Sequence, residues 1–101
     1  MFDKLFQAQQ KAEEIKKRLD SISVSGEVED GKIRVIATAN KEIKEIMIDP
    51  VYFKEIDKEE LEELLLVATN KALKQADEIN QAEMQAVTKD MLGGLGGMFN
   101  K

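Results

Sequence analysis

Residues 57–90 read DKEELEELLLVATNKALKQADEINQAEMQAVTKD and contain neither Gly nor Pro. The apolar residues of this stretch recur every three or four positions, which predicts one apolar stripe along a single long helix. They are Leu61, Leu64, Leu65, Ala68, Ala72, Ala76, Ile79, Ala82, Ala86 and Val87. Asp57, followed three residues later by Glu60, forms a capping-box pattern that predicts the start of the helix.

A helix of this length has a consequence for the whole chain. About 30 residues at 1.5 Å each make a rod of roughly 45 Å, whereas a compact domain of about 100 residues has a radius of gyration near 13 Å. The rod should therefore extend beyond its own domain. Its apolar side must then be covered from outside, most simply by a second copy of the chain, so we expect a homodimer.

The composition predicts one small cytoplasmic domain. The 101 residues are 43% hydrophobic and 35% charged, with four Phe, one Tyr and no Trp, so the core should be thin. The absence of Cys excludes disulfides and fits a reducing compartment. The sequence offers neither a secretory signal nor the roughly 20 apolar residues of a membrane span, and we expect no membrane partner.

A second helix is predicted at residues 2–20. Its apolar residues follow a heptad seam that is rich in Ala, so that a partner helix can approach closely. Together with three residues of the long helix, this seam is the predicted dimer interface: Leu5, Ala8, Ala12, Ile15, Leu19, Ala72, Ala76 and Ile79.

Between the helices, the hydrophobic period changes to that of strands at residues 22–28, 32–39 and 43–48. The pair Asp30-Gly31 predicts a two-residue hairpin turn, and residues 40–42 a second turn. Pro50 ends the third strand, and residues 51–53 read as a short apolar bridge. The expected fold is α+β, in the order α-β-β-β-α with a three-stranded antiparallel meander, over a domain of residues 1–92. The glycine-rich residues 93–101 are expected to form a flexible tail.

The residue types that most enzymes need are missing. There is no His, and the three Ser, at positions 21, 23 and 25, have no suitable base, which excludes triad-type catalysis. The paired carboxylates on the long helix are ordinary solvated positions, and their spacing does not fit a metal-binding loop. We therefore expect no catalysis, metal, cofactor or small-molecule substrate.

The basic residues of the two helices allow two interpretations. Lys4, Lys11 and Arg18 are seven apart and share one flank of the first helix, while Lys71 and Lys74 are neighbours on the long helix. They are either solvated helix faces with local ion pairs, or two basic flanks that a dimer presents to phosphates. The net charge of −5 argues against a partner held mainly by phosphate attraction.

The whole chain resembles the YbaB/EbfC family of bacterial nucleoid-associated proteins. The matching features are QAQQKAEEIKKRLDSISVSG at 7–26, IMIDP at 46–50, ELEELLLVATNKALKQADEINQAEM at 60–84, and the Gly/Met/Phe-rich tail. The resemblance implies homodimers whose sheets meet centrally and whose helices project as arms. It also implies binding to double-stranded DNA with low or moderate sequence preference, at the nucleoid, with effects on nucleoid organisation and gene expression.

By position, the arms correspond here to residues 2–20 and 61–90. The DNA-binding candidates carried over are Lys4, Lys11, Lys16, Lys17, Arg18, Lys71 and Lys74. Gln75-Ala76-Asp77-Glu78 departs from the expected pattern, because this part of the second arm is acidic. The alternative function is a protein-interaction scaffold that binds a partner helix on the apolar faces of the arms.

Overall fold

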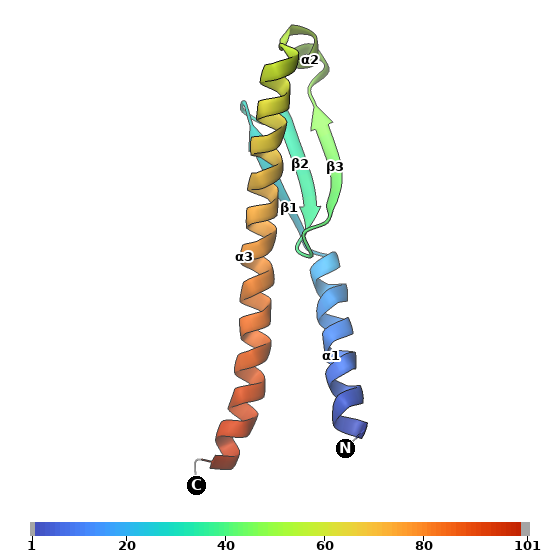
Figure 1. Ribbon diagram of the computed structural model, residues 1–101, viewed down its shortest axis with the longest axis vertical. Helices are drawn as coiled ribbons and strands as arrows, with labels where there is room; N and C mark the ends of the chain where they lie inside the picture. The colour runs from blue at the N-terminus through green and yellow to red at the C-terminus, as the bar shows by residue number, and fades with distance from the viewer. Residues whose placement is uncertain (1, 100–101) are drawn as a thin grey trace.

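The computed structural model describes the backbone of residues 2–99 and the side chains of residues 5–89. A helix, a three-stranded meander and two further helices follow one another along the chain (Figure 1). These elements are α1 (Phe2–Asp20), β1 (Ser23–Val28), β2 (Ile33–Thr38), β3 (Ile43–Ile48), α2 (Pro50–Glu55) and α3 (Lys58–Phe99). The predicted α+β fold and the order of its elements are confirmed.

The three strands form one antiparallel sheet in the order β1-β2-β3. Val24 of β1 lies opposite Ala37 of β2, and Val35 of β2 lies opposite Ile46 of β3. Residues that lie opposite one another point to the same face of a sheet. One face therefore carries apolar side chains from all three strands.

The turn between β1 and β2 differs from the prediction. It is closed by a hydrogen bond from the N–H of Gly31 to the carbonyl of Val28 (3.2 Å), and its two central residues, Glu29 and Asp30, both have positive φ. This is the pattern of a type I′ turn, placed one residue earlier than the Asp30-Gly31 pair. The pairing of Val28 with Ile33 leaves four residues in the connection rather than two.

Helix α3 packs on the apolar face of the sheet across β1 and β2, and leaves β3 largely uncovered. Ala68, Ala72 and Ala76 are fully buried there, and Ile33 and Val35 are the largest side chains that are fully buried. A Cβ atom on Gly26 would lie 2.0 Å from the carbonyl oxygen of Ala68. Small residues on both sides thus bring the helix close to the strand, and the core is as thin as the composition predicted.

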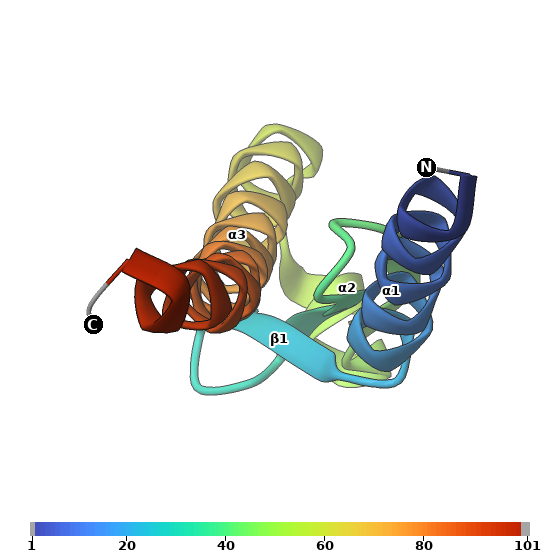
Figure 2. The ribbon, with the colours of Figure 1, turned by 90° about the horizontal axis from the view of Figure 1, so that it is seen from below.

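The long helix extends far beyond the sheet, as its length predicted. The molecule measures 67 × 25 × 17 Å, and its radius of gyration is 19.5 Å, against about 13 Å for a compact chain of this length. Beyond the sheet, α1 runs beside the second half of α3, and both free ends lie at the same end of the molecule (Figures 1 and 2). We call these two projecting segments the arms.

Two boundaries differ from the sequence-based expectations. Residues 51–53 belong to the short helix α2, because Asp49 accepts the N–H of Tyr52 (3.0 Å) as an N-cap and Pro50 occupies the first turn. Burial raises the pKa of the Tyr52 hydroxyl, and the nearby carboxylates of Glu29 and Glu60 raise it further. Helix α3 continues to Phe99, beyond residue 92, and the flexibility of residues 93–101 stays a prediction.

Three of the eight predicted dimer-interface residues are buried inside the subunit, and a fourth is partly buried there. Ala72 and Ala76 are fully buried against the sheet, Ile79 packs on the same cluster, and Leu19 is 3% exposed. Ala72 and Ala76 are not available to a second chain, because the sheet, which sequence periodicity cannot place, already covers them, and Leu19 is buried as well. Ile79 is only partly buried, and the rest of the predicted interface stays a prediction. Leu5, Ala8 and Ala12 are exposed, and Ile15 is half-buried.

Candidate nucleic-acid interface

Three basic residues of α1 lie at the space between the two arms. Lys11 and Arg18 line a hollow of about 310 Å³ together with Val87 of α3. Lys11 and Lys16 also line a neighbouring groove of about 350 Å³, whose other walls are mostly apolar. Lys17 is exposed on the same helix, and the side chain of Lys4 lies outside the described residues. One arm thus carries a group of basic side chains at the space between the arms.

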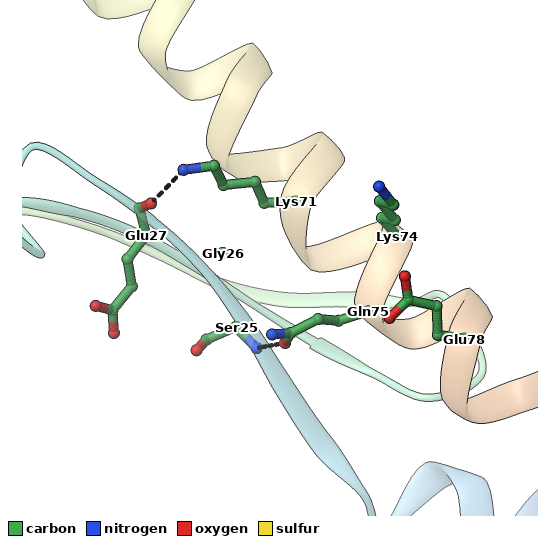
Figure 3. A pocket seen from close by; sticks show the side chains of 7 residues that line it. All are labelled: Ser25, Gly26, Glu27, Lys71, Lys74, Gln75 and Glu78. Atoms are coloured by element: carbon green, nitrogen blue, oxygen red, sulfur yellow. Dashed lines mark hydrogen bonds between the residues drawn. The ribbon is translucent and has the colours of Figure 1, made fainter.

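The two basic residues of α3 lie elsewhere, at the edge of the sheet formed by β1 (Figure 3). Lys71 donates its ammonium group to the carbonyl of Glu27 (3.2 Å), and Gln75 accepts the backbone N–H of Ser25 (3.3 Å). These contacts satisfy outward-facing backbone groups of β1, which would otherwise be open to strand pairing. Lys74 points away from the strand.

The predicted DNA-binding residues therefore form two groups within one subunit. Lys11, Lys16, Lys17 and Arg18 belong to the α1 arm, and Lys71 and Lys74 belong to the β1 edge. In the second group, the ammonium group of Lys71 bonds to the sheet edge, whereas that of Lys74 is directed outward.

Two carboxylates of α3 pair with basic residues elsewhere in the subunit. Asp77 pairs with Lys41 in the turn between β2 and β3 (2.8 Å), and Glu83 pairs with Arg18 of α1. Ala76 is in the core, and Gln75 caps the β1 edge. Of the two carboxylates that departed from the pattern of a DNA-facing arm, Asp77 is used in a contact inside the subunit, whereas Glu78 is exposed and lines the hollow at the β1 edge.

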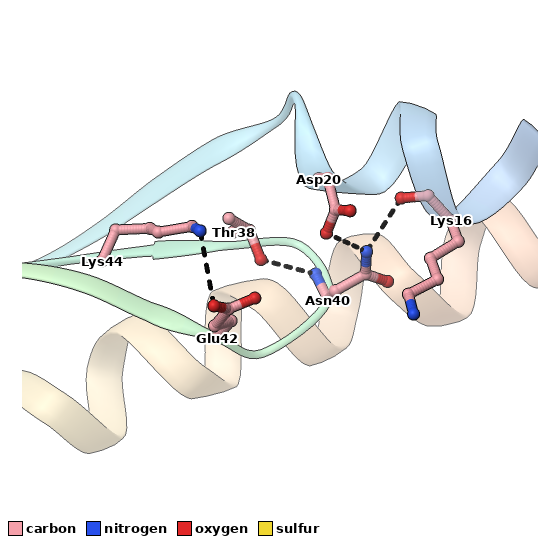
Figure 4. Close-up of polar contacts among 6 residues, drawn as sticks. All are labelled: Lys16, Asp20, Thr38, Asn40, Glu42 and Lys44. Carbon is pink, nitrogen blue, oxygen red and sulfur yellow. Dashed lines mark hydrogen bonds and ion pairs between the residues drawn. The ribbon is translucent and has the colours of Figure 1, made fainter.

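The turn between β2 and β3 joins three elements. The side-chain amide of Asn40 donates to the carbonyl of Lys16 (2.9 Å) and to the carboxylate of Asp20, both in α1 (Figure 4). Its backbone N–H donates to the hydroxyl of Thr38 (3.2 Å). On the other side, the amide of Asn80 in α3 donates to the carbonyl of Ala39 (3.2 Å).

The sequence did not indicate that Asn40, Lys41 and Asn80 connect different elements, because their partners are distant in the chain. One signal was present: Asp77, Asn80 and Glu83 are spaced three apart, so that these polar residues follow one side of the helix beside its apolar stripe.

Within the part of the chain that the structure describes, no three potential metal ligands are grouped closely enough to hold an ion. Among the same residues, no helix is long and apolar enough to cross a membrane.

The family model of the YbaB/EbfC DNA-binding family matches residues 1–91, which include both arms and the sheet. The chain belongs to this family. A nucleoid-associated protein of Flavobacterium johnsoniae is 38% identical over 100 residues, covering 99% of this chain and 92% of the relative. A nucleoid-associated protein of Ruminiclostridium cellulolyticum is 42% identical over 91 residues, covering 90% and 78% respectively. The resemblance drawn from the sequence is confirmed.

A solved structure has the same fold as this chain. The crystal structure of an uncharacterized protein from Helicobacter pylori superimposes with a TM-score of 0.63 at 18% identity, covering 77% of this chain and 90% of the other. At this identity the likeness concerns the fold alone, and it confirms the α+β arrangement.

Proposed function

We propose that two copies of this chain form a dimer that clasps duplex DNA with its arms at the nucleoid. The observation that carries the proposal is the basic flank of α1, where Lys11 and Arg18 lie on a helix that projects beyond the sheet. Membership of a DNA-binding family and the names of the nucleoid-associated relatives support the same conclusion.

The proposed dimer uses the side of the subunit that α3 leaves uncovered. Ile46 of β3 is 53% exposed although it lies opposite the buried Val35, so the apolar face continues past the edge of the helix. Leu66 and Leu73 are seven apart on α3, and Asp77, which follows Leu73 by one helical turn, bonds to Lys41 beside β3. This side of α3 therefore faces the same opening, and Leu66 is 62% exposed.

A second subunit on this face would cover apolar surface that one chain leaves in water. Burial of apolar surface contributes about 25 cal/mol per Å², and a small core with few large side chains gains most from such a contact. The free edge of β3 also offers backbone groups for pairing, whereas Gln75 and Lys71 cap the edge of β1. We therefore place the dimer interface on β3 and the adjacent side of α3.

Dimerisation doubles the basic flanks and presents them to the two strands of a duplex. Lysine and arginine contacts with phosphates position a protein on DNA without reading its sequence. The arms have no recognisable base-reading motif, so sequence preference would arise mainly from the shape and deformability of the DNA. Binding of this kind supports a role in nucleoid organisation and, through it, in gene expression.

The test is a gel-shift titration of duplex DNA over a series of salt concentrations. The wild-type affinity should fall as salt rises, because each phosphate contact releases counterions. Lys11→Glu combined with Arg18→Glu should weaken binding at least about tenfold on every sequence, since four unit charges change in each subunit at the phosphate-facing flank.

The matched control is Lys54→Glu combined with Lys58→Glu. It makes the same change in charge at the end of the molecule opposite the arms. Equal losses in the two double variants would show only a general charge effect. Unchanged binding in the arm variant would place the DNA interface elsewhere.

A protein-interaction scaffold is the second candidate, and the groove between the arms favours it. Ala8, Ala12 and Ile15 of α1 face Met84 and Val87 of α3 across this groove, which suits the apolar side of a partner helix. Pull-down from cell extract before and after nuclease treatment separates the candidates. Partners that survive nuclease support the scaffold, and partners lost with the nucleic acid support the DNA clasp.

A further inference from the structure

Three polar residues of α3 tie this helix to the rest of the subunit along one side. Asp77 pairs with Lys41, Asn80 donates to the carbonyl of Ala39, and Glu83 pairs with Arg18. They follow one another at intervals of three residues, and their partners pass from the turn after β2 to the α1 arm. We call Asp77, Asn80 and Glu83 with these partners the polar ladder.

The near end of the ladder is fixed to α1 through the turn. Ala39 donates its N–H towards the carbonyls of Leu19 (3.2 Å) and Ile22 (3.1 Å), and Asn40 bonds to the last turn of α1 through Lys16 and Asp20. A displacement of Ala39 or Lys41 should therefore also move the C-terminal end of α1. The base of one arm and the middle of the other are joined by a few polar contacts.

Among the residues whose side chains the structure describes, α1 becomes more exposed beyond the ladder. Along the seam of α1, Leu19 is 3% exposed and Ile15 half-buried, whereas Leu5 is 64% exposed. Burial thus decreases steadily from the junction towards the free end. Because the described part of the α1 seam is exposed from Ala12 to Leu5, we expect the relative direction of the two arms to depend on the contacts at their base.

The most distal contact of the ladder uses a residue that the proposed function needs. The side chain of Arg18 is 56% exposed and that of Glu83 is 28% exposed, so water and salt reach the pair. Such surface ion pairs contribute little to stability and exchange partners readily. When a DNA phosphate approaches Arg18, the guanidinium group is already paired with the carboxylate of Glu83.

We propose that the polar ladder positions the two arms, and that Glu83 competes with DNA phosphate for Arg18, so that DNA binding and release of the distal contact occur together. Glu83 and Asn80 are then positioning residues that act through Arg18 and through the turn. The competition rests on the proposed DNA binding, whereas the positioning of the arms does not.

The positioning is tested without DNA, by distances between spin labels. Cysteines introduced at Gln9 and Ala86, both exposed, place one label on each arm of a chain that has no other Cys. Labelled protein is mixed with an excess of unlabelled protein, so that only distances within a subunit are measured. Asn80→Asp replaces the donor facing the carbonyl of Ala39 with an acceptor, and should lengthen and broaden the distance distribution.

The matched control is Gln85→Glu, which adds the same charge at an exposed position of α3. It should leave the distribution unchanged. Far-ultraviolet circular dichroism accompanies both variants, so that a change in arm distance is distinguished from loss of the fold. A folded Asn80→Asp variant with the wild-type distribution would overturn the positioning.

The competition is tested by a double-mutant cycle in the gel shift. Glu83→Gln should tighten DNA binding by about twofold to fivefold, the range that a surface ion pair allows. Glu13→Gln makes the same change in charge at an exposed position of α1 and measures the general electrostatic gain. In an Arg18→Gln background, the extra gain from Glu83→Gln over Glu13→Gln should disappear.

The outcomes separate the two proposals. An extra gain that requires Arg18 supports the competition. Equal gains from Glu83→Gln and Glu13→Gln, or a gain that persists without Arg18, overturn it. A wild-type chain that binds no DNA overturns both the proposed function and the competition, while the distances between the labels still decide whether the ladder positions the arms.

Discussion

At the scale of single residues, the contact between α3 and the sheet is made by small residues that let the two backbones approach closely. Gly26 of β1 has no room for a side chain, because its neighbours are the backbone atoms of Ala68 and Ala72. Backbone atoms cannot move aside as the end of a flexible side chain can. The Gly in the first strand and the Ala stripe of the long helix, both visible in the sequence, therefore pack against each other in one helix–strand contact.

Gly26→Ala should lower the free energy of unfolding by about 2–3 kcal/mol, the upper part of the range for overpacking, since the helix must move off the strand. Urea denaturation measures the change. Ser25→Ala, at the neighbouring position on the opposite face, is the control and should change the free energy of unfolding by less than about 0.5 kcal/mol. A Gly26→Ala variant as stable as the wild type would mean that a side chain fits between the helix and the strand.

At the scale of elements, the two edges of the sheet are treated differently. β1 is capped by side chains of α3, while β3 keeps an open edge and exposes Ile43 and Ile46. An uncapped edge beside apolar side chains can pair with a strand of a second chain. The contrast between the edges supports β3 as the site of dimerisation, in place of the buried alanines that sequence periodicity suggested.

Ile46→Lys should convert the dimer into a monomer at micromolar concentration, because a charge would be buried in the interface without a partner. Size-exclusion chromatography with light scattering measures the mass. Glu45→Lys is the control: Glu45 lies opposite Ile36 on the other face of the sheet and is exposed. If the Ile46→Lys variant keeps the mass of the wild type, the interface does not include this face.

At the scale of the whole molecule, the chain is too elongated to protect its own apolar surface. Its long dimension of 67 Å is more than twice either of the others. Only Ile33 and Val35 are large and fully buried among the described residues, whereas Phe6, Phe53 and Leu66 are each more than half exposed. Such a shape has a high ratio of surface to core, which association with a second chain reduces.

The wild-type chain should therefore show twice its mass of 11.4 kDa in light scattering throughout dilution into the micromolar range. Its thermal unfolding should depend on protein concentration, because association stabilises only the folded state. A fully folded species with the mass of one chain at these concentrations would contradict the dimer, and with it the paired arrangement of the arms.

The sequence by itself determined the order of the elements, the overhang of the long helix and the family, since each follows from local periodicity, turn chemistry or motifs read in order. The tertiary structure alone decided which apolar residues are buried within the subunit and which remain exposed. It assigned Ala72 and Ala76 to the core, left Ile46 and Leu66 exposed, and brought Glu83 to Arg18. The physical reason is that periodicity gives the side of a helix on which a residue lies, whereas the surface that covers this side is set by contacts between residues far apart in the chain.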